Sequence, residues 1–261
     1  LTSVTIGNSV TEIGGSAFRF CSSLVDLKIP FSVSWIRGNA FRGTKLTEVT
    51  IPNPNCVIAD NAFDESVTVI KLRQVPKDYF TIQQAIDAAV GGDTILISPG
   101  IYVENKIDTG GKWLTIKSTD GAESTIIQGD GMNEGLTIRS ITGLSEEVIL
   151  IEGIQFTNHR QALNAWGAFT TVTVLDCIFY QNDGYAIRSD SKMTIRNCQF
   201  IENGIIGSKG GRGGAINGYG NSGRNGYPVI DNSIFIGNVV QIICKCFGVV
   251  KYNPKSVISI M

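Results

Sequence analysis

The chain has 261 residues, with 22 Lys plus Arg against 23 Asp plus Glu and a formal net charge of −1. Because the charges are balanced and form no block, the long-range attraction that nucleic acid or an anionic membrane exploits is missing, and no nucleic-acid partner is predicted. The single histidine, His159, excludes multi-histidine zinc sites and mechanisms that use paired histidines.

The sequence predicts neither a membrane span nor a disulfide framework. The most apolar late stretch, VVQIICKCFGVV at 239–250, is short and contains Lys245, so we expect no membrane insertion in this segment. The chain begins at Leu1, inside a repeat, so we expect a fragment whose missing leader says nothing about its destination. The cysteines form no CxxC pairs and are predicted to be buried thiols. They are Cys21, Cys56, Cys177, Cys198, Cys244 and Cys246.

Residues 1–75 carry a short repeat. Four similar segments recur at spacings of 23, 22 and 21 residues: LTSVTI at 1–6, LVDLKI at 24–29, LTEVTI at 46–51 and VTVIKL at 67–72. A second mark keeps the same rhythm: SAF at 16–18, NAF at 39–41 and NAF at 61–63. Apolar and polar residues alternate as in a strand with one buried face, and a unit this small must stack on its neighbours. A short solenoid is therefore predicted.

The pattern LxxVxIPxxVxxIxxxAFxxCxxL, clearest from Leu1 to Leu24, resembles the leucine-rich repeats of BspA-like bacterial surface antigens. The sequence departs from it at Gly7, where the pattern prefers proline, and at Asp64, where the first unit has Arg19. The resemblance implies an extracellular or cell-surface protein that contacts other proteins or a matrix, and it implies no enzyme activity.

The segment FTIQQAIDAAVG at 80–91 predicts a capped amphipathic helix. Thr81 and Gln84 fit a capping box, Gly91 suits the terminating position, and one face is apolar. That face consists of Ile82, Ala85, Ile86 and Ala89. Such a helix is suited to plug the open end of a β-solenoid.

The segment DTILISPGIYVEN, which follows this helix, predicts strand, Pro-Gly turn and strand. Helix and strands together resemble the entry segment of right-handed parallel β-helix proteins of the pectin-lyase-like superfamily. The predicted fold is an all-β solenoid, with a leucine-rich repeat array at 1–75. A single-stranded right-handed parallel β-helix with an N-terminal capping helix follows at 76–261.

A four-residue mark recurs from residue 150 onward: FTNH at 156–159, FYQN at 179–182, FIEN at 200–203 and FIGN at 235–238. Alignment on the Phe predicts two inward columns. One holds Ile149, Val172 and Met193, and the other holds Ile151, Val174, Ile195 and Ile230. Cys177 and Cys198 would stack on adjacent coils, about 4.8 Å apart, as thiols poorly aimed for a disulfide.

Asp176 is the residue most easily mistaken for a catalytic carboxylate. Its column contains Gly153, Asn197 and Asn232, all residues that favour tight bends, so Asp176 is predicted to form a corner between strands.

The Asn column of Asn182, Asn203 and Asn238 is predicted to form a ladder of side-chain hydrogen bonds at the next turn. His159 occupies the equivalent place, and a structural role is expected for it.

A further strand in each coil is predicted from GLTIRS at 135–140, ALNA at 162–165, AIRS at 186–189 and AING at 215–218. If Ile138, Leu163, Ile187 and Ile216 point inward, the next residues form an outward ladder with aromatic rings beside it. The candidate ligand-binding residues are Arg139, Asn164, Trp166, Arg188, Asn217 and Tyr219. Guanidinium, amide and aromatic groups in this pattern can bind an acidic or neutral glycan, although a solvated strand face has the same composition.

The glycine-rich segment 204–226 lengthens one coil and is predicted to be a surface loop on one face of the solenoid. It contains Lys209, Arg212 and Arg224 but no phosphate-binding GxxxxGK[ST] pattern. The F-x-x-N marks and GGAI at 213–216 resemble repeats of polymorphic outer-membrane autotransporter adhesins.

The pectin-lyase-like resemblance implies polysaccharide lyases, glycoside hydrolases and pectin esterases as alternatives. The NTD, DD and histidine-glycine marks of polygalacturonases and the Gly-Arg-Pro-Trp run of pectin esterases are absent from the sequence. No catalytic residue is assigned. No cofactor or metal is predicted, with calcium expected only if the chain is a lyase.

The function predicted from sequence is non-catalytic recognition or adhesion at the cell surface or outside the cell. The expected partner is a polysaccharide or a surface protein of a host or matrix. A polysaccharide lyase or another carbohydrate-active enzyme is the first alternative, and a structural stalk is the second.

Overall fold

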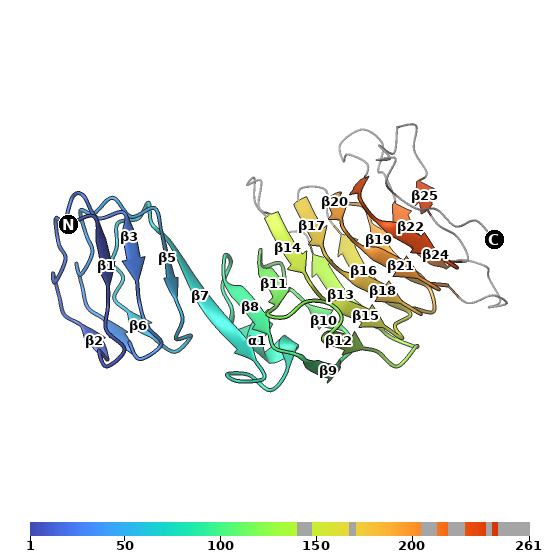
Figure 1. The fold of residues 1–261 in the computed structure, drawn as a ribbon, viewed down its shortest axis with the longest axis horizontal. Coiled ribbons are helices and arrows are strands. Elements are labelled where there is room, and N and C mark those ends of the chain that lie inside the picture. Colours follow the sequence, from blue (N-terminus) through green and yellow to red (C-terminus); the bar gives the residue numbers. More distant parts are fainter. Residues whose placement is uncertain (140–147, 167–170, 205–212, 219–227, 239–241, 245–261) are drawn as a thin grey trace. The chain divides into compact units, whose positions relative to one another are not determined.

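The computed structural model describes residues 1–139, 148–166, 171–204, 213–218, 228–238 and 242–244 (Figure 1). The chain divides into two compact units. The first comprises Leu1–Arg73 with Gly92–Thr94, and the second comprises Gln74–Gly91 with Ile95–Met261. In both units the described strands pair in parallel, so the predicted all-β solenoid is confirmed.

The first unit has two strands in each coil. One side carries β1 (Ser3–Thr5), β3 (Asp26–Lys28), β5 (Glu48–Ile51) and the start of β7 (Thr68–Val75), with β1 paired to β3 and β5 paired to β7. The other side is a three-stranded sheet in the order β2 (Glu12–Ile13), β4 (Trp35–Ile36) and β6 (Val57–Ile58). Parallel pairing between consecutive coils is the arrangement that the repeat spacing predicts.

A stack of aromatic rings fills the first unit. Phe18, Phe41 and Phe63 lie face to face, with ring centroids 5.1 Å apart at each step. These residues are the Phe of the SAF and NAF marks, so the repeat phase taken from that mark is confirmed. Each ring covers the next because successive coils place equivalent side chains one strand spacing apart.

The pairing of β5 with β7 differs by one residue from the alignment of LTEVTI with VTVIKL. Val49 lies opposite Val69 and not Ile70, and Ile51 lies opposite Lys71. Lys71 can stand in an otherwise apolar column because its ammonium donates to the carbonyl of Cys56, at 2.9 Å. Alternation alone does not reveal the slip, since both registers place a β-branched residue opposite Val49.

A buried ion pair ties β7 to the segment before β8 (Thr94–Ile97) within the first unit. Arg73 donates twice to Asp93 Oδ2, from Nε at 2.9 Å and from Nη2 at 2.7 Å. The other carboxylate oxygen accepts the backbone N–H of Lys71, at 3.1 Å. The side chains of Arg73 and Asp93 are 7% and 1% exposed, so both charges are removed from water. Each buried charge is therefore stabilised by the opposite charge of its partner.

The second unit has three strands in each coil, one in each of three parallel sheets. One sheet holds β8, β11 (Thr115–Ser118), β14 (Val148–Glu152), β17 (Thr171–Leu175), β20 (Lys192–Arg196) and β23 (Val229–Asp231). The next holds β9 (Gly100–Val103), β12 (Thr125–Gln128), β15 (Gln155–Thr157), β18 (Ile178–Tyr180), β21 (Gln199–Ile201) and β24 (Ile234–Ile236). The third holds β10 (Ile107–Asp108), β13 (Glu134–Arg139), β16 (Gln161–Trp166), β19 (Tyr185–Ser189), β22 (Gly214–Gly218) and β25 (Ile242–Cys244).

Helix α1 (Ile82–Ala88) packs on the core at the first coil of the second unit. Thr81 and Gln84 form the predicted capping box, and Glu104 accepts the free N–H of Ile82 at 2.8 Å. The helix ends at Ala88, so the expectation that Gly91 terminates it is wrong. Gly91 instead lies against the Trp113 indole, where a β-carbon would come within 2.3 Å of Nε1. No described helix is long and apolar enough to cross a membrane.

The inward columns of the second unit follow the predicted register. Phe156, Phe179, Phe200 and Phe235 pair in sequence, and their rings stack with centroids 5.4, 5.0 and 4.8 Å apart. The columns headed by Ile149 and Ile151 are confirmed as well. In the two earlier coils the place of the Phe is taken by Tyr102 and Ile127, which carry no F-x-x-N mark.

Asp176 forms part of a corner, as expected. Asp176, Asn197 and Asn232 have φ of 52°, 53° and 45°, and Gly153 has 66°. This left-handed backbone is the conformation that Asn, Asp and Gly tolerate best. The side chains of the three polar residues join into an exposed ladder, because Asn197 Nδ2 donates to Asp176 Oδ1 at 2.9 Å and Asn232 Nδ2 donates to Asn197 Oδ1 at 2.7 Å.

The predicted asparagine ladder lies at the next turn and is buried. Asn182 and Asn203 each donate to the carbonyl of a Phe on the preceding coil and to the side chain of the next Asn. His159 stands at the foot of the ladder, where its Nε2 lies 3.2 Å from the carbonyl of Ile127. Burial lowers the pKa of His159, against the opposing influence of that carbonyl and of the Asp130 carboxylate. A structural role for His159 fits this geometry.

The free thiols are Cys21, Cys56, Cys177 and Cys198. Cys177 and Cys198 are fully buried and stacked on adjacent coils, as predicted, and Cys56 is buried in the first unit. Burial, followed by the neighbouring Cys198, raises the pKa of Cys177 well above its ordinary value. The side chain of Cys244 and all of Cys246 lie outside the described residues.

Candidate binding face

The outer face of the sheet β10-β13-β16-β19-β22 carries the candidate site. On each strand an inward residue is followed by an outward one, and the register aligns them. The inward column is Ile107, Leu136, Leu163, Ile187 and Ile216. The outward column, called here the outer column, is Asp108, Thr137, Asn164, Arg188 and Asn217.

The expectation that Arg139 belongs to the outer column is wrong. Leu136, and not Ile138, aligns with Leu163, so Thr137 takes the place expected for Arg139. Arg139 lies two residues further along β13, directly opposite Trp166 on β16. The structure therefore brings Arg139 and Trp166 together and aligns Asn164 with Arg188 and Asn217. Tyr219 and the cations at 209, 212 and 224 lie outside the described residues.

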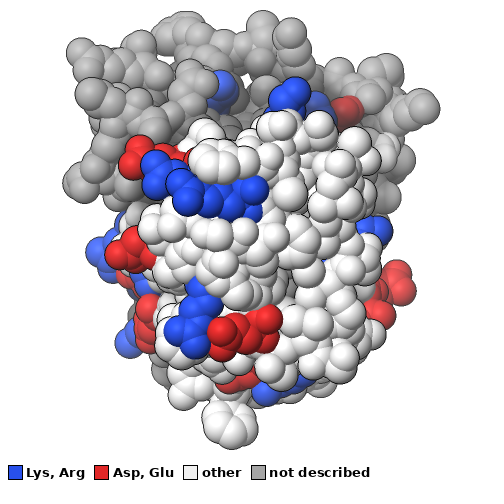
Figure 2. Space-filling model, turned by 90° about the vertical axis from the view of Figure 1, so that its left-hand side faces the viewer, with Lys and Arg blue, Asp and Glu red and all other residues white. Residues whose placement is uncertain are grey.

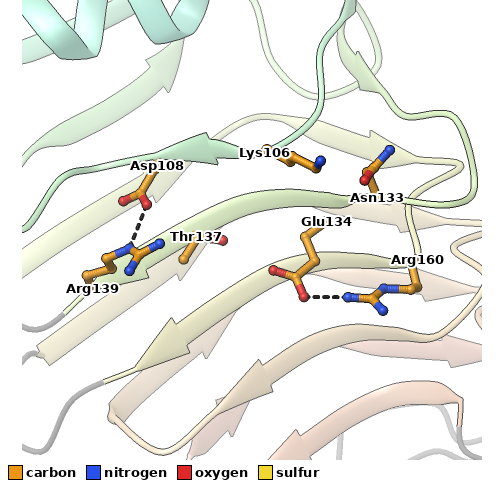
Figure 3. A pocket seen from close by; sticks show the side chains of 7 residues that line it. All are labelled: Lys106, Asp108, Asn133, Glu134, Thr137, Arg139 and Arg160. Atoms are coloured by element: carbon orange, nitrogen blue, oxygen red, sulfur yellow. Dashed lines mark hydrogen bonds and ion pairs between the residues drawn. The ribbon is translucent and has the colours of Figure 1, made fainter.

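A polar pocket of about 380 Å³ opens over the start of this face (Figure 3). Its lining combines residues of β10 and β13 with residues that come just before β10, β13 and β16. The lining residues are Lys106, Asp108, Asn133, Glu134, Thr137, Arg139 and Arg160. Three cationic and two anionic side chains give the lining one net positive charge.

Two ion pairs hold the arginines of the pocket in place (Figure 3). Arg139 Nε donates to Asp108 Oδ2 at 2.6 Å, and Arg160 Nη2 donates to Glu134 Oε1 at 2.7 Å. The other oxygen of Asp108 accepts the backbone N–H of Gly110, at 2.8 Å. A guanidinium has five N–H donors, so each arginine is oriented by one bond and keeps donors for a ligand.

Lys106 is the third cation of the pocket and is exposed. Its backbone is left-handed, with φ of 57°, at the residue before β10. Among the described residues no acidic side chain pairs with it. Its ammonium therefore keeps its charge available to a bound anion.

The described part of the chain holds no cluster of three or more His, Cys, Asp or Glu side chains suited to a metal.

The middle of the face is aromatic and amide-rich. The guanidinium of Arg188 lies over the Trp166 ring, with Cζ 4.7 Å from the ring centroid. Asn164 is fully buried although it belongs to the outer column, and Asn217 is nearly so. Neither Oδ1 nor Nδ2 of Asn164 has a hydrogen-bond partner in the described structure.

The sequence predicted the alignment of Asn164, Arg188 and Asn217, but of the residues that line the pocket it singled out only Arg139. The missed residues are Lys106, Asp108, Asn133, Glu134, Thr137 and Arg160. They belong to coils without the F-x-x-N mark or lie at coil corners. A signal existed in the alternation of Leu136 with Thr137, which permits the register that the structure has.

Charge elsewhere is mixed. On the face drawn in Figure 2, basic and acidic side chains lie next to one another and most of the described surface is uncharged. The described residues of that face therefore form no extended patch of one sign, in line with the balanced composition. Recognition of a charged ligand must come from a local arrangement such as the pocket.

Residues 1–85 match the family model described as BspA type Leucine rich repeat region, in six copies. No curated protein matches the chain. The match confirms the leucine-rich repeats predicted at the N-terminus. Repeats of this type are typical of cell-surface and secreted proteins, which supports a surface or adhesion protein and identifies no partner.

Proposed function

We propose that this chain is a non-catalytic recognition protein, displayed on a cell surface or secreted, that binds an acidic glycan through the outer face of the sheet β10-β13-β16-β19-β22. The observation that carries the proposal is the pocket in which carboxylates orient Arg139 and Arg160 beside the exposed Lys106. The leucine-rich repeats support the surface location.

The pocket suits an anionic group for a physical reason. Binding a carboxylate or sulfate with a free arginine requires the long side chain to be ordered first, at a cost in rotamer entropy. Asp108 and Glu134 already hold the two guanidinium groups, so that cost is met in the free protein. A charge-assisted bond to a guanidinium is about twice as strong as a neutral one.

A polymer suits this face better than a small anion. The outer column continues from the pocket through Asn164 and Arg188 to Asn217, one strand spacing at a time. Trp166 lies beside it, and an aromatic face stacks on the apolar side of a sugar ring. An extended glycan can therefore place its charged group in the pocket and its next sugars along the coils.

The test is binding of the whole chain to immobilised alginate, polygalacturonate and a neutral polymer such as dextran. We expect binding to the acidic polymers, weakened roughly tenfold by Arg139→Ala, because a hydrogen bond to a charged group contributes about 1.5–3 kcal/mol. Arg196→Ala is the matched control, since Arg196 is also exposed and pairs with an aspartate, Asp231, away from this sheet. Equal loss in both variants, or equal binding to dextran, would contradict the proposal.

Two other outcomes separate the alternatives. Release of unsaturated or reducing-end products from these polymers, with calcium present, would show a polysaccharide lyase or hydrolase and overturn the non-catalytic assignment. If no cleavage products form and no glycan on a broad array is bound, a structural stalk would be favoured. The Arg139→Ala variant connects binding to the pocket, because glycan binding that survives this substitution would belong to another surface.

A further inference from the structure

Asn164 occupies a position that should face solvent and yet is 0% exposed. It follows the inward Leu163 on β16 and belongs to the outer column between Thr137 and Arg188. Both atoms of its side-chain amide are buried without a hydrogen-bond partner in the described structure. Buried polar side chains are nearly always hydrogen-bonded, so this amide calls for an explanation.

Asn182 shows what a structural asparagine looks like in the same fold. It is 1% exposed, and its Nδ2 donates to Phe156 and to Asn203. Its Oδ1 accepts the backbone N–H of His159. Every polar side-chain atom of Asn182 thus bonds to the coil, whereas neither polar atom of the Asn164 amide has a partner in the part of the chain that the structure describes. Asn164 therefore costs the free protein stability, as functional residues often do.

Arg188 and Trp166 lie beside this amide. Arg188 starts opposite Asn164 on the neighbouring strand, and its guanidinium ends over the ring of Trp166, two residues beyond Asn164. The two residues of this contact are therefore neighbours of Asn164, one on the same strand and one on the next. The contact between the Arg188 guanidinium and the Trp166 ring joins two partly exposed side chains, which can move aside for a ligand more readily than a packed core.

We propose that Asn164 is the floor of a subsite that binds two adjacent hydroxyl groups of a sugar ring, closed in the free protein by Arg188 and Trp166. The inference rests on the proposed function and adds which chemical groups of the neighbouring sugar are recognised. It applies to the sugar next to the charged one, because Thr137 lines the pocket and Asn164 lies on the following strand, about 4.8 Å away.

The chemistry of the amide selects this ligand. An asparagine side chain presents an acceptor oxygen and a donor NH₂ group side by side, and each hydroxyl both donates and accepts. One hydroxyl can donate to Oδ1 while its neighbour accepts from Nδ2, which satisfies both buried atoms at once. A carboxylate only accepts, so it would leave Oδ1 without a donor. Trp166 can stack on the C–H face of the same ring.

The first measurement compares thermal unfolding of Asn164→Leu with that of Asn182→Leu in the full chain. Leucine has a similar size, so no large cavity confuses the result. We expect Asn164→Leu to keep or raise the melting temperature and Asn182→Leu to lower it by roughly 5 °C or more. A comparable fall in both variants would make Asn164 a structural residue and overturn the proposal.

The second measurement uses alginate and polygalacturonate before and after mild periodate oxidation, which cleaves the bond between hydroxyl-bearing carbons and leaves the carboxylates. Wild type should lose roughly tenfold in affinity on oxidation of the polymer, whereas Asn164→Leu should bind both forms equally, at the lower affinity. If Asn164→Leu binds native polymer as tightly as wild type, the subsite is wrong while the glycan function stands. If wild type binds neither native polymer, the proposed function and the subsite both fail.

Discussion

Asn203 donates its side-chain amide to the carbonyl of Phe179 at 2.9 Å and to Asn238 Oδ1 at 2.9 Å, while its own Oδ1 accepts from Asn182. It thereby links three successive coils through one buried side chain. The ladder gives the solenoid a repeated polar contact inside an otherwise apolar interior. Such a contact is costly to break, because each partner is left buried and unsatisfied.

Loss of one rung should therefore destabilise the second unit. Asn203→Ala is expected to lower the free energy of unfolding by about 3 kcal/mol, since several buried groups lose their partners. Urea denaturation followed by circular dichroism measures it. Asn232→Gly is the control, because it removes an exposed rung and keeps a left-handed backbone, as Gly153 does in the same column. A similar loss in both variants would contradict the role given to the buried ladder.

Stability should depend on pH through His159. Burial lowers the pKa of His159 in the folded chain, so the unfolded chain binds a proton more readily. Stability must then fall as the pH drops below about 6.5, by up to about 2 kcal/mol at pH 5. His159→Asn should remove this dependence and remain folded, because an Asn amide can donate to the Ile127 carbonyl as Asn182 donates to Phe156. Unfolding curves of both proteins at pH 5 and pH 7.5 measure this dependence. If the variant keeps the pH dependence of the wild type, His159 is not its cause.

Thiol labelling should follow burial. Cys56, Cys177 and Cys198 are buried free thiols, and Cys21 is partly exposed. Burial also raises the pKa of Cys56 and of Cys177, which lowers the fraction of reactive thiolate. Iodoacetamide under native conditions should modify Cys21 first and the other three only after unfolding, as peptide mass spectrometry can follow. Prompt native labelling of Cys177 would mean that the thiol stack is open to solvent.

The buried ion pair of Arg73 and Asp93 should contribute more to stability than an exposed pair that also forms two hydrogen bonds. Asp93→Ala is expected to cost about 3–5 kcal/mol, because it leaves a buried guanidinium without its carboxylate. Glu12→Ala removes the carboxylate from Arg37, a pair at 2.9 Å that is exposed, and should change the unfolding midpoint very little. Equal effects of the two substitutions in urea denaturation would contradict this account of the first unit.

The interior of the solenoid could be read from the sequence because burial fixes its register. A Phe that must stack on the Phe of the next coil tolerates no slip, and the corner residues Asp176 and Asn197 mark the same phase from the outside. The sequence therefore predicted the inward columns, the corners and the asparagine ladder of the second unit correctly. It also predicted the helix, but not its last residue, because Ala89 closes the helix through a backbone bond to Ile86 without a left-handed glycine.

The outer face is less constrained, and the sequence misplaced it. Leu136 and Ile138 are both buried, so the sequence allows either to align with Leu163 on the next strand. The tripeptide IRS, which occurs at 138–140 and again at 187–189, favoured Ile138, whereas the structure pairs Leu136 with Leu163. The pocket was missed for another reason. Its charged residues are brought together from three coils, and neither Lys106 nor Arg160 belongs to a strand. Only the three-dimensional register shows that they meet.

The central claim is that an acidic glycan lies along the outer face of β10, β13 and β16. Hydroxyl-radical footprinting of the full chain, with and without saturating alginate or polygalacturonate, tests it most directly. The account predicts that oxidation of Trp166 slows when the polymer is bound, while that of Trp35, 40% exposed in the first unit, stays the same. Protection of Trp35 with Trp166 unchanged would place the ligand elsewhere and contradict the account.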